Sequence, residues 1–359
     1  LTTSAFADEE VTYEHPSDIN SVVDIMKNYA FIGFNEVDMN GHQHINLLVN
    51  KVVGLPGDMG IRKNYAGVYE YYVNKLPENI SGELKIGEND PCVSNLTIGS
   101  DYTISTNGSE RYIEPNHVKV SPSVTNIKAE TATNKYIDLV NLQNSFISYS
   151  AMLAENADST EGFGFEGQYD SNSHTWQNIN RINVTAESGT VFYNIDDTNF
   201  SKINSDAIIN FSDTSTASIV LNIDLKNISW DRKPFRLNIG GNQPTMNEDV
   251  ILENNVNRIY YNFYDSSAAD KMTTKTVSMT DAAHGTIIIP KGAAKVGSNW
   301  CGVIVANNIG ATGESHFVGA YNPVVPTSAT VDVTVNKVWS EPSGQSHDSY
   351  YVKVDLMRS

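Results

Sequence analysis

Two apolar runs near the C-terminal end show the strongest pattern of hydrophobic and polar positions. Residues 286–289 read Thr-Ile-Ile-Ile, residues 302–306 read Gly-Val-Ile-Val-Ala, and a Gly or Pro turn closes each run. Neither run alternates between apolar and polar side chains, so both faces of each strand should be covered. The pattern predicts stacked parallel strands whose inner faces fill a tube.

Strand-like segments recur along most of the chain, and Asn, Gly, Asp and Ser separate them. Such short polar breaks suit turns between successive coils. Layering each segment on the next would leave open edges only at the ends of the stack. No strict repeat period is present, so the predicted solenoid is irregular. The segments are residues 45–53, 67–73, 83–86, 95–105, 117–127, 182–185, 190–195, 207–211, 217–225, 235–239 and 256–264.

Two other segments have a helical period. Residues 17–30 predict a short amphipathic helix capped at Ser17 or Asp18. Residues 134–156 predict a longer helix that begins at a Thr133 or Asn134 cap. At about 1.5 Å per residue it would extend some 34 Å, or roughly seven strand layers. Its buried stripe would comprise Leu139, Leu142, Phe146, Tyr149 and Leu153.

Length and charge exclude several classes of protein. The 359 residues suffice for one large domain and a small one. The formal charge of −18, with 24 scattered Lys and Arg residues, argues against nucleic-acid binding. No run of about 20 apolar residues exists, so no membrane insertion is predicted. Ala5 and Ala7 precede an acidic stretch, as at the end of a signal peptide. Residues 1–7 are therefore predicted to be its remnant, and the protein to be secreted.

The two cysteines, Cys92 and Cys301, are too few for a disulfide scaffold. They are candidates for one long-range disulfide in an oxidising compartment. Cys301 lies within an apolar run, however, so simple packing of its thiol is the alternative.

Tyrosine is the most suggestive candidate for ligand binding. The chain has 18 Tyr and 12 Phe residues, and the tyrosines cluster. Tyrosine combines apolar area with a polar tip, which suits an exposed ligand surface. The alternative is that solenoid walls half-bury these rings. The candidate ligand-binding residues are Tyr69, Tyr71, Tyr72, Tyr260, Tyr261 and Tyr264.

Metal and catalytic motifs are weak. His42 and His44 fall on one side of an extended strand, but no third ligand is identifiable, so no metal site is predicted. Asp196, Asp197 and residues 88–90 offer oxygen ligands that leave calcium open, and no other cofactor is expected. A glycosidase carboxylate pair cannot be singled out, and a Gly-x-Ser-x-Gly elbow is absent.

Several of these motifs resemble a known family. Residues 285–297 and 300–322 resemble the closing coils of the choice-of-anchor A domain, a bacterial surface domain sometimes described as collagen-binding. Residues 254–267 and 191–212 are similar to upstream segments of that family. The resemblance implies a β-solenoid like that of ice-binding proteins, with a long helix against the strand stack. Ice binding itself needs a regular Thr-rich face, and Thr273, Thr274 and Thr276 form only one short patch.

The end of the chain resembles a second family. Residues 329–356 are similar to the first hairpin of a collagen-adhesin B-type module. In that family a lysine at the position of Lys337 forms an intramolecular isopeptide bond with an asparagine on the last strand. No Asn follows Lys337 in this chain, so the resemblance implies an incomplete module.

Together these patterns predict a mainly β protein with four parts. They are a signal-peptide remnant (1–7), an irregular parallel β-solenoid with one long flanking helix (8–322), a linker (323–328) and a partial Ig-like B-type module with a β-hairpin (329–359). The predicted function is that of a non-catalytic adhesin at a Gram-positive cell surface or cell wall, with a host extracellular-matrix protein or glycan as partner. The alternatives are a structural subunit of a surface layer or pilus, and a polysaccharide-active enzyme.

Overall fold

The computed structural model describes residues 11–16, 21–55, 58–60, 68–78, 80, 82–86, 93–246 and 254–325. The chain divides into two units between Val325 and Pro326. The signal-peptide remnant, the B-type hairpin with Lys337, and Cys92 lie outside the described residues. The disulfide, the module and the domain boundaries therefore stay predictions.

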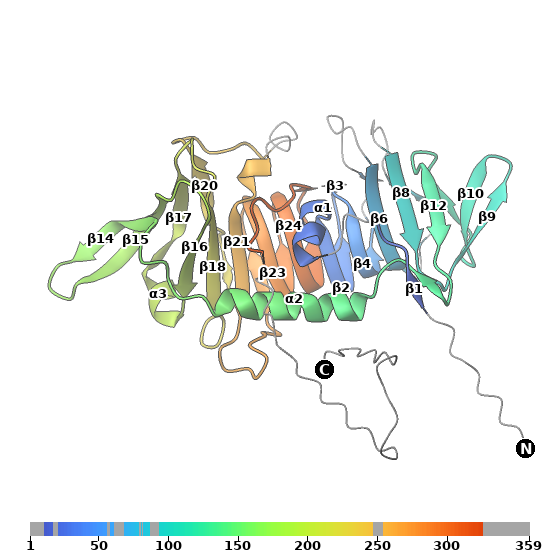
Figure 1. The fold of residues 1–359 in the computed structure, drawn as a ribbon. Coiled ribbons are helices and arrows are strands. Elements are labelled where there is room, and N and C mark those ends of the chain that lie inside the picture. The colour runs from blue at the N-terminus through green and yellow to red at the C-terminus, as the bar shows by residue number, and fades with distance from the viewer. Residues whose placement is uncertain are drawn as a thin grey trace, which may run out of the picture. The chain divides into compact units, whose positions relative to one another are not determined.

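A parallel sheet forms the main wall of an irregular β-solenoid (Figure 1). Every neighbouring pair along this wall is parallel, which confirms the predicted fold. In spatial order the strands are β12 (Asn126–Ala129), β8 (Val93–Ile98), β6 (Val68–Lys75), β4 (Leu47–Gly54), β2 (Phe31–Met39), β24 (Trp300–Ala311), β23 (Ala283–Val296), β21 (Ile259–Tyr264), β18 (Ser218–Asp224) and β16 (Thr190–Ile195).

The order of the strands differs from the expected stacking of each segment on the previous one. The chain begins in the middle of the wall at β2 and builds outward to β12. Helix α2 (Leu139–Ala154) then carries it along the wall, and the chain returns from β16 inward to β24. The first coil thus pairs with the last, β2 with β24, at a central seam.

Helix α2 begins later than predicted. Asp138 is its N-cap, because its carboxylate accepts hydrogen bonds from the backbone N–H groups of Val140 and Asn141. Asn134 instead belongs to β13 (Asn134–Lys135), which pairs with β1 (Thr12–Tyr13). Leu142, Phe146, Tyr149 and Leu153 are buried, as the helical period predicts. The predicted caps Thr133 and Asn134 were therefore wrong. Four of the five predicted stripe residues are buried, and Leu139 is half-buried against the same cluster.

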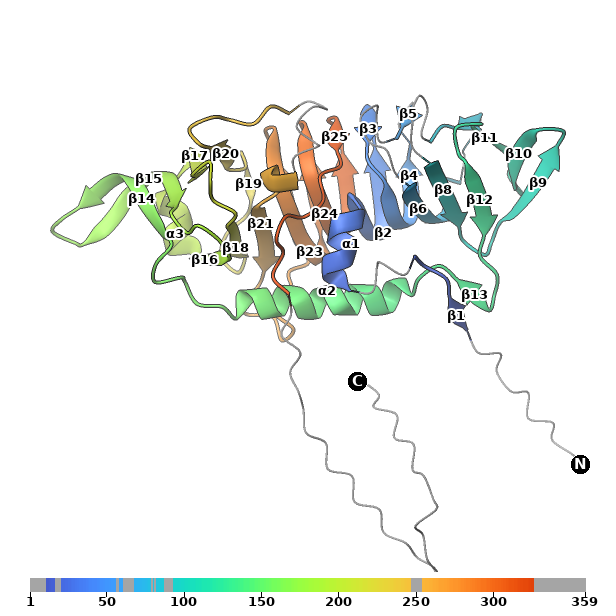
Figure 2. The same ribbon diagram turned by 45° about the horizontal axis from the view of Figure 1, so that its top comes forward.

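Helix α2 and the short helix α1 (Val22–Asn28) cover the outer face of the wall (Figure 2). Ile288, Val303 and Val305 pack in this outer cluster, whereas Ile287 and Ile304 pack in the core inside the solenoid. Both faces of the two apolar runs are therefore covered, as predicted. The N-cap of α1 is Ser21, and the predicted caps Ser17 and Asp18 lie outside the described residues.

A buried amide network also attaches α2 to the wall. Ser150 Oγ donates to Asn262 Oδ1 at 2.6 Å, and Asn262 Nδ2 donates to Asn222 Oδ1 at 2.9 Å. Asn222 Nδ2 in turn donates to the backbone oxygen of Leu153 at 2.8 Å. Satisfied networks of this kind fix one arrangement of helix against sheet.

The remaining strands complete the coils or extend from the two ends. Antiparallel pairs occur in both end sheets, where only parallel layering was predicted, because the turns at residues 108–109, 115–117 and 171–174 fold the chain back on itself. The coil strands are β3 (His42–His44), β5 (Asp58–Met59), β19 (Asp231–Arg232), β22 (Thr276–Met279) and β25 (Ser315–His316). The end sheets contain β7 (Glu83–Leu84), β11 (Val118–Val120), β10 (Glu110–Glu114) and β9 (Thr103–Asn107) at one end, and β14 (Phe163–Asp170), β15 (Thr175–Val184), β17 (Ile203–Phe211) and β20 (Arg236–Ile239) at the other.

Candidate ligand-binding groove

A groove of about 620 Å³ lies over β6, β8 and β12, on the part of the wall nearest its β12 end. The segment before α1 forms its other side. Polar side chains line much of it, and a groove with a few convergent polar groups is the usual form of a binding site. The lining residues used below are Tyr13, Glu14, Glu70, Asn95, Asn126 and Lys128.

Three side chains form a polar ladder along the floor of the groove. Glu70, Asn95 and Asn126 occupy the same register position on β6, β8 and β12. Asn95 Nδ2 donates to Glu70 Oε1 at 2.7 Å, and Asn126 Nδ2 donates to Asn95 Oδ1 at 2.8 Å. In-register parallel strands place equal positions on one face, which explains the alignment. Amide groups at these positions offer both donors and acceptors to a ligand.

An aromatic and a charged side chain stand at the rim. Tyr13 is 46% exposed, and its hydroxyl donates to Asp138 Oδ2 at 3.3 Å. Partial burial and the nearby Asp138 carboxylate raise the pKa of this phenol, so it stays a neutral donor at physiological pH. Lys128 Nζ lies 3.5 Å from Glu14 Oε2 across the groove. The rim thus combines an apolar ring face with polar tips.

A smaller pocket of about 180 Å³ continues from the groove and shares Pro16 and Glu70 with it. Tyr69 lines this pocket, half-buried, with its ring edge toward Phe317 at 6.5 Å between centroids. Of the six predicted tyrosines, Tyr69 therefore lies beside the candidate site.

The other predicted tyrosines lie elsewhere. Tyr72 stacks on Tyr136 at 4.9 Å under the helix-covered face, and Tyr71, Tyr260 and Tyr261 are buried in the two hydrophobic clusters. Burial raises the pKa of the Tyr261 phenol and prevents the ring from meeting a ligand. The ligand-surface prediction is thus corrected for these four residues, because a wall covered on both faces buries its aromatic rings.

Tyr264 is half-buried and lies far along the wall from Tyr69, on β21. Burial, followed by Asp224, Asp196 and Asp158, raises the pKa of its phenol to about 12. Asp196 caps the short helix α3 (Asp197–Lys202), where its carboxylate accepts from the N–H of Asn199 at 2.8 Å. Capping therefore explains this acidic turn. Calcium stays an untested prediction, and residues 88–90 lie outside the described part.

The structure separates the two histidines of β3. His42 is exposed, whereas His44 is buried with its Nε2 at 2.7 Å from Glu314 Oε1. Glu314 directly precedes β25, and His316 of β25 lies beside His44. Sequence reasoning missed Glu314 and His316, because only the pairing of the first and last coils brings them to His44.

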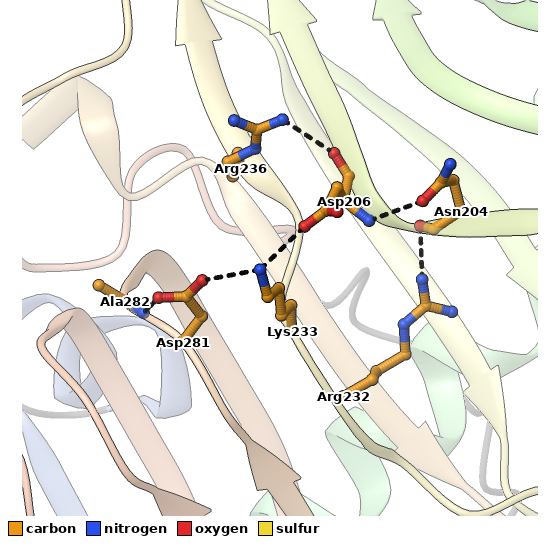
Figure 3. Close-up of polar contacts among 7 residues, drawn as sticks. All are labelled: Asn204, Asp206, Arg232, Lys233, Arg236, Asp281 and Ala282. Carbon is orange, nitrogen blue, oxygen red and sulfur yellow. Dashed lines mark hydrogen bonds and ion pairs between the residues drawn. The ribbon is translucent and has the colours of Figure 1, made fainter.

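A lysine bridges two carboxylates at the opposite end of the wall (Figure 3). Lys233 Nζ lies 3.1 Å from Asp206 Oδ1 and 3.6 Å from Asp281 Oδ2. Arg236 donates to the backbone oxygen of Asp206 at 3.2 Å. These contacts tie β17 and β20 to the segment before β23. Asp206 and Asp281 are therefore held together through ion pairs with the single ammonium group of Lys233.

The fold is an irregular parallel β-solenoid with a polar groove on one wall. The family model described as "Putative Ice-binding-like adhesive domain" matches residues 23–317. The chain belongs to this family of ice-binding-like adhesive domains. The family indicates adhesion to an external partner, outside the cell or at its surface.

Comparisons with curated proteins and with solved structures add little to the family match. No curated protein matches the chain in sequence. Among solved structures, the chain is similar to a glycosylated ice-binding protein from an Arctic yeast. That match has 13% identity, covers 88% of this chain and 100% of that one, and has a TM-score of 0.30. In the part of the chain that the structure describes, no helix has the length and hydropathy needed to cross a membrane.

Proposed function

We propose that this chain is the binding domain of a secreted bacterial cell-surface adhesin, and that the groove over β6, β8 and β12 binds a glycan of the host extracellular matrix. The choice-of-anchor A resemblance supports a surface role, and the B-type resemblance supports a stalk that follows the domain. Membership of an adhesive family supports binding rather than catalysis.

The Glu70–Asn95–Asn126 ladder carries the proposal. Sugar hydroxyls both donate and accept hydrogen bonds, and carboxylate and amide groups in a row match them. Tyr13 adds a ring face at the rim of the groove, and Tyr69 adds one in the adjoining smaller pocket, where apolar sugar faces can pack. A protein partner would instead favour a larger apolar core in the interface. The polar floor therefore favours a glycan.

A binding experiment with paired variants tests this function. Wild-type protein is screened on a glycan array, and the strongest hit is titrated calorimetrically. Asn95→Ala should weaken binding about tenfold or more, since each lost buried hydrogen bond costs about 1–3 kcal/mol. The matched control is Asn183→Ala. Asn183 belongs to a second Glu–Asn–Asn ladder, with Glu166 and Asn210, on the β14–β15–β17 sheet outside the groove.

Equal loss in both variants would place the ligand elsewhere or reveal a general folding effect. Absence of glycan binding by the wild type, together with self-assembly in solution, would contradict adhesion through this groove and favour a structural subunit of a surface layer.

A further inference from the structure

Four side chains that commonly bind metals occupy one register column across the central seam. His284 of β23 pairs with Cys301 of β24, and Cys301 pairs with His316 of β25. His316 pairs in turn with His44 of β3. Neighbouring parallel strands lie about 4.8 Å apart, and equal register positions face the same side. The sheet therefore brings three imidazoles and a thiol into one row.

A carboxylate joins two of these imidazoles. Glu314 Oε1 lies 2.7 Å from His44 Nε2 and 3.8 Å from His316 Nε2. The two imidazole rings stack with centroids 5.0 Å apart and planes 5° apart. Ligand atoms of the three residues all lie within 4.8 Å of one another. His44 and His316 are 3% and 2% exposed, whereas Glu314 is 37% exposed and leaves one side open to solvent.

We propose that His44, Glu314 and His316 bind one Zn²⁺ ion. Two imidazole nitrogens and one carboxylate oxygen are a common protein set for zinc, and a water molecule can fill the fourth position from the exposed side. Calcium prefers oxygen ligands alone, so the two nitrogens select a transition metal. Since the rings are nearly parallel, binding requires each to tilt toward the carboxylate.

The other two residues of the row, His284 and Cys301, are not part of the proposed ligand set. The Cys301 thiol is buried and is not among the ligand atoms that lie within 4.8 Å of one another, so it is not counted as a ligand. His284 makes a 3.3 Å contact with the backbone oxygen of Thr245 through Nε2. The proposed site is therefore the part of the row that Glu314 joins.

The position of the site gives it a structural role. His44 belongs to the first coil and His316 to the last, on strands that pair directly at the seam. An ion held by both coils binds the folded protein and not the unfolded chain, which stabilises the fold by mass action. The ion would thus join the first and the last coil of the chain at the central seam.

Metal titration of tag-free protein tests the proposal. After EDTA treatment and its removal, Zn²⁺ is titrated calorimetrically, and the melting temperature is measured with and without the ion. One ion per chain should bind and raise the melting temperature. His316→Gln and Glu314→Gln should each weaken binding about tenfold or more. The control is His117→Gln, which removes the imidazole of an exposed pair with Glu114 at 2.8 Å and should leave binding unchanged.

Glu314→Gln changes a partly exposed side chain at constant size, so it should fold even if His316→Gln does not. X-ray absorption of the wild-type zinc complex counts the imidazole ligands independently. Two imidazoles support the site, and fewer than two overturn it. The proposal also fails if the wild type binds no Zn²⁺, or if both variants bind it as tightly as the wild type.

Discussion

The two halves of the solenoid wall differ in what lies on their outer face. Over β18, β21, β23 and β24, the outer face packs under α2 in a hydrophobic cluster. Over β8 and β12, the outer face instead forms the floor of the groove. The same parallel sheet is thus a buried layer in one half and the open floor of a groove in the other.

The difference follows from the side chains of the strands. Residues 286–289 have no hydrophilic position other than Thr286, whose hydroxyl donates to Asn257 Oδ1 at 2.9 Å. Strand β8 reads Val-Ser-Asn-Leu-Thr-Ile, with Asn95 half-exposed, and Asn126 of β12 is exposed. Polar outward positions can be covered only where the covering layer bonds to them, as Ser150 and the backbone of Leu153 bond to Asn262 and Asn222. Asn95 and Asn126 have no such helix above them and face the groove instead.

Truncating the helix anchor should have the largest effect on the covered half. Phe146 is buried between α2 and the sheet, with its ring 6.0 Å from that of Phe34. Phe146→Ala should lower the free energy of unfolding by about 3–5 kcal/mol, because it leaves a cavity. Val140→Ala, on the same helix but 70% exposed, should change it by less than about 0.5 kcal/mol. Urea denaturation of both variants measures the contrast, and similar values would show that α2 does not cover the wall.

Lowering the pH should have the second largest effect on stability, through a buried histidine in the covered half. Burial lowers the pKa of His284 from 6.5 to about 4. Between these values the unfolded chain binds a proton that the folded chain does not, so stability falls as pH drops from 6.5 toward 4. The full loss is about 3 kcal/mol. Stability curves of the wild type and His284→Asn should be parallel above pH 7 and converge below it; parallel curves throughout would contradict the buried neutral imidazole.

Replacing one asparagine in each half should give the smallest difference in the free energy of unfolding. Asn262→Leu removes the partner of Ser150 Oγ and of Asn222 Oδ1, and it should lower the free energy of unfolding by about 1–3 kcal/mol. Asn95→Leu should cost less than about 0.5 kcal/mol, since water can replace the half-exposed amide. Thermal unfolding compares the two. A larger cost at Asn95 would mean that the groove floor is part of the core.

Local patterns predicted the features that depend on neighbouring residues. The three-and-four spacing identified the buried stripe of α2, and the continuous apolar runs identified strands covered on both faces. The pairing of β2 with β24 was not predictable, because no local pattern records which distant segments meet. The polar ladder was missed for the same reason, since Glu70, Asn95 and Asn126 become neighbours only in the stack. The prediction that Tyr71 and Tyr261 face a ligand was wrong because tyrosine is common both in protein interiors and on surfaces.

The seam at β2 also constrains how the chain can be made. During synthesis β2 emerges early, but its partner β24 is among the last strands to appear. Until then one edge of β2 has no native neighbour, and unpaired strand edges invite association with other chains. A newly made molecule must therefore keep this edge away from other copies until the final coil arrives. However quickly the single coils stack, the column can close only after β24 has been made.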